Sequence, residues 1–265
     1  MNYDNFLWFI EERESIRRKK DTGLPQPWTE DHILRNTRFC NIDRYHDAGT
    51  KRILDFIKEK NLWEKVYYTV LYRAALSSQR FLDSMTGIWM HDYRNLKYLE
   101  MNISDARKPY QVFLYKGDTI STFLSNVASP VAKCVFEEHF TWTNASILDV
   151  SQFITNTFNT NYRKRLIFLA TEITKDLSYF LSIDPDSECN MNVGARLALK
   201  KLDGRRIDRK VDDLLNMTNL SQSSLEHALC EWGRYLTRWD YYREHGSLKD
   251  YWLYRSEAFQ DLSCK

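Results

Sequence analysis

Acidic side chains gather in the second half of the chain, with a spacing that could serve chemistry at a sugar or a base. Glu172 and Asp176 are four residues apart in a segment with helical periodicity, so they share one face of the expected helix. Asp184 and Asp186 follow in a loop. An ionised carboxylate can stabilise positive charge that develops on a sugar, or orient an attacking water. From residue types alone, a salt-bridged helix face and an Asp-rich turn explain these residues better, because both are common.

Basic side chains form three clusters, although the formal net charge of the chain is only +2. The clusters lie at residues 13–20, 163–165 and 200–210. Such clusters can bind a phosphate backbone, or they can be solvated helix faces. Among the many aromatic residues, Trp28, Tyr110 and Tyr162 are candidates for stacking on a base, with core packing as the alternative.

Several motifs of nucleotide and metal chemistry are absent from the sequence. It contains no Walker A loop, GxGxxG, HExxH or GxSxG, so ATP, dinucleotide and zinc-protease chemistry have no support. His227 and Cys230 lie three residues apart, but no second ligand pair accompanies them, so a hydrogen-bond network is favoured over a metal site. We therefore expect neither a metal nor an organic cofactor.

The composition indicates a folded chain in a reducing compartment. Hydrophobic residues make up 43% of the 265 residues, which is enough for a real core. The five cysteines are far apart and form no CxxC pair. No apolar run is long enough to span a bilayer, and the N-terminus lacks the features of a secretory signal. These features predict a cytoplasmic protein without a membrane segment.

The apolar periodicity is mainly helical. It predicts helices over residues 3–20, 29–38, 51–76 and 163–181, with a turn at 21–28 between the first two. Residues 82–118 are less regular, and 111–115 can be read as a short strand or an apolar loop.

Local signals mark three helix ends. Ser146 with Asp149 resembles a capping box, and Ser223 with Glu226 forms a second S-x-x-E box. The helix that follows the second box should run to about Glu244 and be closed by Gly246.

Six segments resemble, in order, the motifs of one protein family. The first and last are the most specific: RNTRFCNIDRYHDAGT at 35–50, preceded by PWTEDHIL at 27–34, and LEHALCEWGRY at 225–235. Softer matches are KPYQVFLY at 108–115, FLATEITKDLSY at 168–179 and NVGARLALKKL at 192–202. Together they resemble the alpha-glutamyl/putrescinyl thymine pyrophosphorylase family, which includes the helical domain attached to phage hydroxymethyl-deoxyuridine DNA kinases.

The resemblance implies a mainly α-helical fold of the helix-hairpin-helix DNA glycosylase type, with two helical lobes around a cleft. It also implies action on modified pyrimidines in DNA, chiefly of viral genomes. Some members resemble transferases that replace the pyrophosphate of an activated 5-methyl group with an amine. Others resemble bacterial defence glycosylases that excise a bulky modified base. Both would flip the nucleotide into the same pocket.

The chain departs from the family pattern at two places. The hairpin, FNTNYRKR at 158–165, has no glycine, although glycines there would let backbone amides approach a phosphate. A Pro-Gly run is replaced by CNMNVG at 189–194, which alters an expected pocket wall. The first departure weakly favours a divergent glycosylase, and the second predicts a substrate that differs from the usual one.

The resemblance assigns several polar residues to a base pocket. If residues 38–47 are helical, Arg44 and Asp47 lie near each other, and the alternative is a buried polar network. A histidine in the C-terminal segment could donate a proton near neutral pH, or it could be a satisfied helix contact. The base-pocket candidates are Arg38, Asn41, Arg44, Asp47, Tyr110, Glu226, His227 and Glu231.

The catalytic candidate is Asp186, which follows the hairpin helix by a short loop, with Asp176 as its rival and Glu172 as a third acid. The expected DNA-binding residues are Tyr162, Arg163, Lys164, Arg165, Asn192, Arg196, Lys200, Lys201, Arg205 and Arg206.

These observations lead to one preferred hypothesis and two alternatives. The preferred hypothesis is a monomeric DNA glycosylase, a single domain over 1–265 with lobes near 1–145 and 146–265. It would flip a modified pyrimidine out of double-stranded DNA of the phage type and hydrolyse its N-glycosidic bond. The first alternative is an amino acid or polyamine transferase acting on a pyrophosphorylated hydroxymethyl pyrimidine. The second is a non-enzymatic module that senses modified bases.

Overall fold

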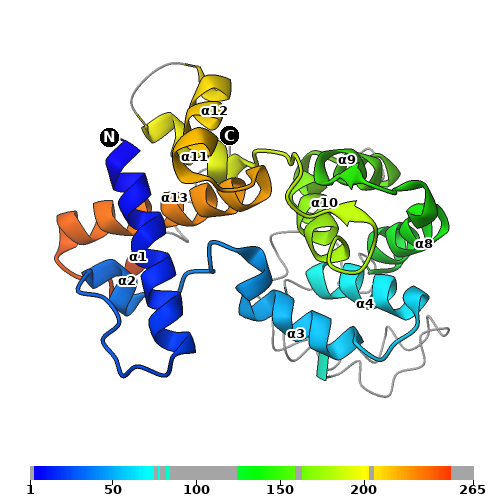
Figure 1. Ribbon diagram of the computed structural model, residues 1–265, viewed down its shortest axis with the longest axis horizontal. Coiled ribbons are helices and arrows are strands. Elements are labelled where there is room, and N and C mark those ends of the chain that lie inside the picture. Colours follow the sequence, from blue (N-terminus) through cyan, green and yellow to red (C-terminus); the bar gives the residue numbers. More distant parts are fainter. Residues whose placement is uncertain are drawn as a thin grey trace. The chain divides into compact units, whose positions relative to one another are not determined.

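The computed structural model describes residues 3–74, 77, 82–83, 124–158, 163–202 and 206–251. These residues are mainly helical, as the sequence predicts (Figure 1). They form two compact units, each made from separate stretches of the chain. Unit 1 contains 1–42, 191–219 and 225–265, and unit 2 contains 43–190 and 220–224. These divisions differ from the expected lobes at 1–145 and 146–265, and the single glycosylase-like domain stays a prediction.

Unit 1 is built on α1 (Tyr3–Asp21) and α13 (Gln222–His245). The first three residues of α13 belong to unit 2. Phe6 of α1 packs edge-on against Trp232 of α13, with ring centroids 5.2 Å apart. Both side chains are fully buried. Three shorter helices complete the unit: α2 (His32–Asn36), α11 (Val193–Lys201) and α12 (Ile207–Thr218).

Unit 2 is a helical bundle whose apolar core is formed by α3 (Ala48–Ile57), α4 (Leu62–Ala74), α8 (Ser129–Glu138), α9 (Ile147–Thr157) and α10 (Arg163–Leu177). Short elements connect them: η1 (Arg44–His46), η5 (Leu124–Ala128) and η6 (His139–Thr141). The strands β1 (Ala145–Ser146) and β2 (Ile183–Asp184) pair in parallel. The helices α9 and α10 pack together and flank the predicted hairpin.

Local capping explains where several helices begin and end. The Ser146 hydroxyl accepts a hydrogen bond from the Asp149 N–H, and Asp149 accepts one from the Ser146 N–H, so the predicted capping box is confirmed. Gly246 has φ +66° directly after α13, as expected for a residue that closes a helix. The second box is wrong in detail, because Ser221 rather than Ser223 caps α13 by accepting the Ser224 N–H.

Three predicted helices are wrong in extent. The helix expected over 51–76 is divided into α3 and α4, since Asn61 and Glu64 form their own reciprocal cap. The helix expected over 29–38 is only α2, because Asp31 caps it late and the backbone is already extended at Thr37. The helix expected over 163–181 ends at Leu177. The predictions for 82–118 fall almost entirely outside the described residues.

None of the helices in the described ranges has a stretch that is both apolar enough and long enough to cross a membrane.

Gly194, in the first turn of α11, lies against Cys230 of α13. A Cβ atom added at Gly194 would be 2.9 Å from the Cys230 sulfur. We predict that Gly194→Ala lowers the stability of unit 1 by about 1–3 kcal/mol through overpacking. The double variant Gly194→Ala with Cys230→Ala should recover most of this loss, because the clashing sulfur is gone. Urea unfolding measures both, and a double variant no more stable than the single one would contradict this packing.

Candidate active site

The helix α10 carries two buried carboxylates one turn apart. Asp176 has no solvent exposure and Glu172 has 8%. The helix packs its apolar residues, including Leu169 and Ile173, into the core of unit 2. The carboxylates lie among these residues, so their charges require partners inside the protein.

Asp176 is held by side chains from α3 and α4. The guanidinium of Arg73 donates to both carboxylate oxygens, from Nε to Oδ2 and from Nη2 to Oδ1, the latter at 2.7 Å. Thr50 donates to Oδ1 at 3.3 Å and accepts from Arg73 Nη2 at 2.9 Å. Arg73 also donates to the hydroxyl of Ser77 at 2.6 Å. A two-pronged contact of this kind fixes the carboxylate in position and orientation.

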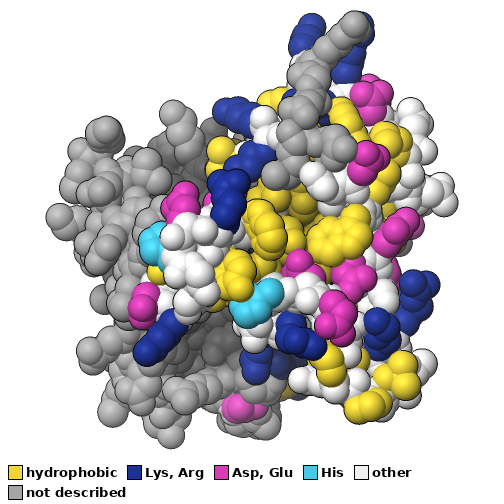
Figure 2. Space-filling model, turned by 90° about the vertical axis from the view of Figure 1, so that its left-hand side faces the viewer, with side chains coloured by type: hydrophobic (Ala, Val, Ile, Leu, Met, Phe, Trp, Pro, Cys, Tyr) yellow, Lys and Arg dark blue, Asp and Glu magenta, His cyan; other side chains and the backbone are white. Residues whose placement is uncertain are grey.

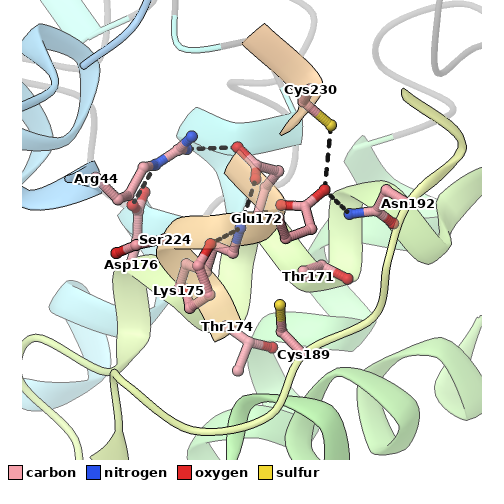
Figure 3. A network of polar contacts seen from close by, with 12 residues as sticks. Arg44, Thr171, Glu172, Thr174, Lys175, Asp176, Cys189, Asn192, Ser224 and Cys230 are labelled. Carbon is pink, nitrogen blue, oxygen red and sulfur yellow. Dashed lines mark hydrogen bonds and ion pairs between the residues drawn. The ribbon is translucent and has the colours of Figure 1, made fainter. Parts of the chain in front are cut away.

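Glu172 has its own cations (Figure 3). Arg44 Nη2 lies 2.5 Å from Glu172 Oε2, and Lys175 Nζ lies 4.0 Å from Oε1. Lys175 also donates to the carbonyl of Ser223 at 3.4 Å. Arg44 Nε lies 4.0 Å from Asp176, so Arg44 links the two carboxylates. The Glu172 side chain is 10% exposed while that of Asp176 is fully buried, so Glu172 is the acid nearer to solvent.

We call these residues the ion cluster: Arg44, Thr50, Arg73, Glu172, Lys175 and Asp176. Its three cations face two carboxylates, and both arginines, the lysine and the two acids are at least nine-tenths buried. Buried ion pairs seldom stabilise a fold more than apolar side chains of the same volume would, because desolvation offsets the attraction. Such a cluster is therefore a candidate for function. Carboxylates held beside cations in this way are candidates for stabilising positive charge that develops in a reaction.

The sequence interpretation identified three members of the ion cluster and missed the other three. Arg44, Glu172 and Asp176 were expected in the site. Thr50 lies at the end of the matched 35–50 segment, and Lys175 lies next to Asp176. Arg73 had a signal of its own, since it continues the buried α4 stripe of Val66 and Val70.

The remaining base-pocket candidates are not arranged as one helical segment. Residues 38–43 are not helical, so the condition under which Arg44 and Asp47 would share one helical face is not met. Asp47 is the N-cap residue of α3, and Arg38 is exposed. Asn41 is half-buried, and Tyr110 lies outside the described residues.

The C-terminal candidates are tied into the packing of unit 1. Glu226 accepts from the Asn192 amide at 3.1 Å and from the Cys230 thiol at 3.2 Å (labelled partners in Figure 3). Glu231 accepts from the Cys40 N–H at 2.9 Å and pairs with Arg234 at 2.5 Å. These contacts favour the alternative of satisfied helix contacts for both acids. His227 is buried, with 6% exposure.

Asp186 lies on an exposed loop after β2. Its backbone N–H donates to the Asp184 side chain at 3.0 Å, which is the hydrogen bond of an Asp-rich turn. The described part of the chain gives Asp186 no cation within ion-pair distance, in contrast to the two acids of α10.

The expected DNA-binding residues are spread over several elements. Arg163, Lys164 and Arg165 begin α10, but their side chains lie outside the described part, as do Tyr162 and Arg205. Arg196, Lys200 and Arg206 are exposed, and Lys201 pairs with Asp240 at 3.0 Å. Asn192 is buried. The role of all ten in DNA binding stays a prediction.

Comparison with known families identifies the chain. Residues 1–223 match the model of the 5-hmdU DNA kinase helical domain. The chain belongs to this family. No curated protein and no solved structure matched. The match covers the whole ion cluster and the predicted hairpin, and it agrees with the helical-domain branch of the resemblance found in the sequence.

The pair of Arg73 and Asp176 gives a prediction about stability. Arg73→Met leaves a fully buried carboxylate without its main partner, so we expect a loss of about 3–5 kcal/mol. Adding Asp176→Leu should restore more than half of this loss, since no unpaired charge is left. Lys51→Met, at an exposed position of α3, is the control and should change stability by less than about 0.5 kcal/mol. Urea unfolding measures all four proteins, and equal stability of Arg73→Met and the control would contradict the pairing.

Proposed function

We propose that the protein is a DNA glycosylase that flips a modified pyrimidine out of double-stranded DNA and hydrolyses its N-glycosidic bond. The observation that carries the proposal is the ion cluster, with Glu172 at its more exposed end. Membership of a family named for 5-hmdU DNA kinases supports a modified pyrimidine in DNA as the substrate. Phosphoryl transfer is not proposed, because the match is to the helical domain and the sequence has no Walker A loop.

The reaction breaks one bond and forms one. The bond between C1′ and N1 breaks, and its electron pair leaves with the base, which gains a proton. Positive charge develops on the sugar, and water adds at C1′ and releases its proton. The products are a free base and an abasic site in the strand.

The residues of the ion cluster have separate roles in this proposal. Glu172 stabilises the positive charge on the sugar and orients the attacking water. Arg44 and Lys175 hold the Glu172 carboxylate in place through their ion pairs. Asp176 and Arg73 are positioning residues, which act through Arg44 and the backbone of α10. The helix-hairpin-helix arrangement belongs to the proposal too, with α9 and α10 as its two helices.

The test is release of a base without added cofactor. Purified protein is incubated with duplex DNA containing 5-hydroxymethyluracil and with phage genomes that carry other modified pyrimidines. Mass spectrometry detects the free base, and alkali reveals abasic sites as strand breaks. We expect both signals on at least one modified DNA and neither on unmodified DNA.

Single substitutions then identify the catalytic acid. Glu172→Gln should lower the rate of base release at least about a hundredfold. Glu188→Gln, at an exposed acid of the same unit, is the control and should leave the rate unchanged. Asp186→Asn should also leave it unchanged. A large loss with Asp186→Asn and none with Glu172→Gln would overturn the assignment of Glu172. Melting temperatures of all variants separate loss of chemistry from loss of folding.

Two results would contradict the glycosylase itself. Incorporation of an amine into pyrophosphorylated DNA, with no base released, would assign a transferase. If neither base release nor amine incorporation is observed, but the protein binds modified DNA selectively, the protein is a module that only senses the base.

A further inference from the structure

Unit 1 contains a cavity of about 430 Å³ with an unusual charge distribution. It lies between α1, the segment around Trp28 and residues 34–39. Four cationic side chains line it: Arg13, Lys20, Arg35 and Arg38. The described residues that line the cavity include no aspartate or glutamate. We call this feature the cationic cavity.

The charges of the cationic cavity are only partly neutralised. Arg35 pairs with Glu30 at 3.7 Å, near the surface. Neither Lys20 nor Arg38 has a carboxylate within 4 Å in the part of the chain that the structure describes. The pKa of Lys20 is lowered, first by burial and then by the neighbouring cations Arg13 and Arg38, while Asp21 acts in the opposite direction. A bound anion would relieve this repulsion and favour the charged form of Lys20.

Arg13 is fixed in the wall of the cavity. It lies on the buried face of α1 with 4% exposure. Its Nη2 donates to the carbonyls of Phe39 at 3.1 Å and Cys40 at 2.9 Å. The Arg13 Nε and the Thr37 hydroxyl, both on lining residues, are buried without a hydrogen-bond partner among the described residues. A group rich in acceptor oxygens would suit this surplus of donors.

Trp28 supplies a flat wall that is held in place. Its indole N–H donates to the Leu24 carbonyl at 2.7 Å, and its own carbonyl accepts from Lys19 at 2.7 Å. The Lys20 ammonium lies 4.7 Å from the centre of the indole ring. On the side of α1 and α2, hydrophobic side chains are exposed beside both basic and acidic ones (Figure 2). Cations next to a fixed aromatic ring are what single-stranded nucleic acid requires, because phosphates meet the charges and bases stack on the ring.

We propose that the cationic cavity binds a phosphate group of a DNA strand, with Trp28 stacking against a neighbouring base. Lys20, Arg38 and Arg13 supply the positive charge, and the Thr37 hydroxyl can donate to a phosphate oxygen. The site goes beyond the proposed glycosylase, because it breaks no bond and uses no residue of the ion cluster.

Binding of a short single-stranded oligothymidine tests this site. Fluorescence anisotropy gives the dissociation constant of the full-length protein between about 50 and 200 mM salt. The double variant Lys20→Ala with Arg38→Ala should bind about tenfold more weakly and lower the salt slope by about 1. The control, Arg17→Ala with Arg18→Ala, also removes two positive charges, both from α1 outside the cavity, and should change affinity less than twofold. Trp28→Ala should weaken binding without changing the salt slope, since it removes stacking alone.

Three outcomes would overturn the proposal. The first is that the wild-type protein does not bind the strand at the lowest salt concentration. The second is that the cavity variant and its control weaken binding equally. In the third outcome, the cavity variant loses affinity for inorganic phosphate or pyrophosphate but keeps its affinity for DNA, so that the ligand is a free phosphate compound. Each of these measurements is an affinity. A negative result therefore rules out the cavity proposal without contradicting the proposed glycosylase, and a protein that releases no base can still bind DNA at the cavity.

Discussion

The ion pair between Arg73 and Asp176 is the constraint on which the organisation of unit 2 depends. Asp176 has no solvent exposure, so its carboxylate requires a hydrogen-bonded cation inside the protein. Arg73 of α4 is that cation, and α4 must therefore pack against α10. Thr50 completes the arrangement, since it contacts both partners from α3. The two carboxylate oxygens of Asp176 thus connect the three helices α3, α4 and α10. Arg44 forms ion pairs with both Glu172 and Asp176, so it connects the two carboxylates.

The segment that carries the clearest family signature serves both units. Residues 35–50 cross the division between unit 1 and unit 2 after Ile42. Before that point the segment contributes Thr37 and Arg38 to the cationic cavity. After it, Arg44 and Thr50 join the ion cluster. One continuous motif therefore supplies two chemically different sites, the cationic cavity before the division and the ion cluster after it.

The sequence predicted what local chemistry determines and missed what tertiary contacts determine. The Ser146 cap, the closing Gly246 and the helix expected over 3–20 follow from residues within a few positions of each other, and they are confirmed. The partners of Asp176 come from 103 and 126 residues away, a distance over which periodicity carries no information. Arg13 shows the same limit: the sequence placed it in a basic cluster, whereas packing buries it under Phe39 and Cys40.

Under these proposals, the cationic cavity and the ion cluster have different functions: one binds DNA and the other catalyses base release. Phosphate contacts position a protein on DNA and make its affinity depend on salt, but they cause no chemistry. A cavity with cations and no carboxylate among its described lining residues suits that role and offers nothing to an oxocarbenium ion. The ion cluster has the carboxylates that the chemical step requires, already paired and largely withdrawn from water. Substitutions in the cationic cavity should then change the affinity for DNA at a constant rate of base release, and substitutions at Glu172 should change that rate at constant affinity. The reason is that different side chains contribute to the free energy of binding and to the free energy of activation.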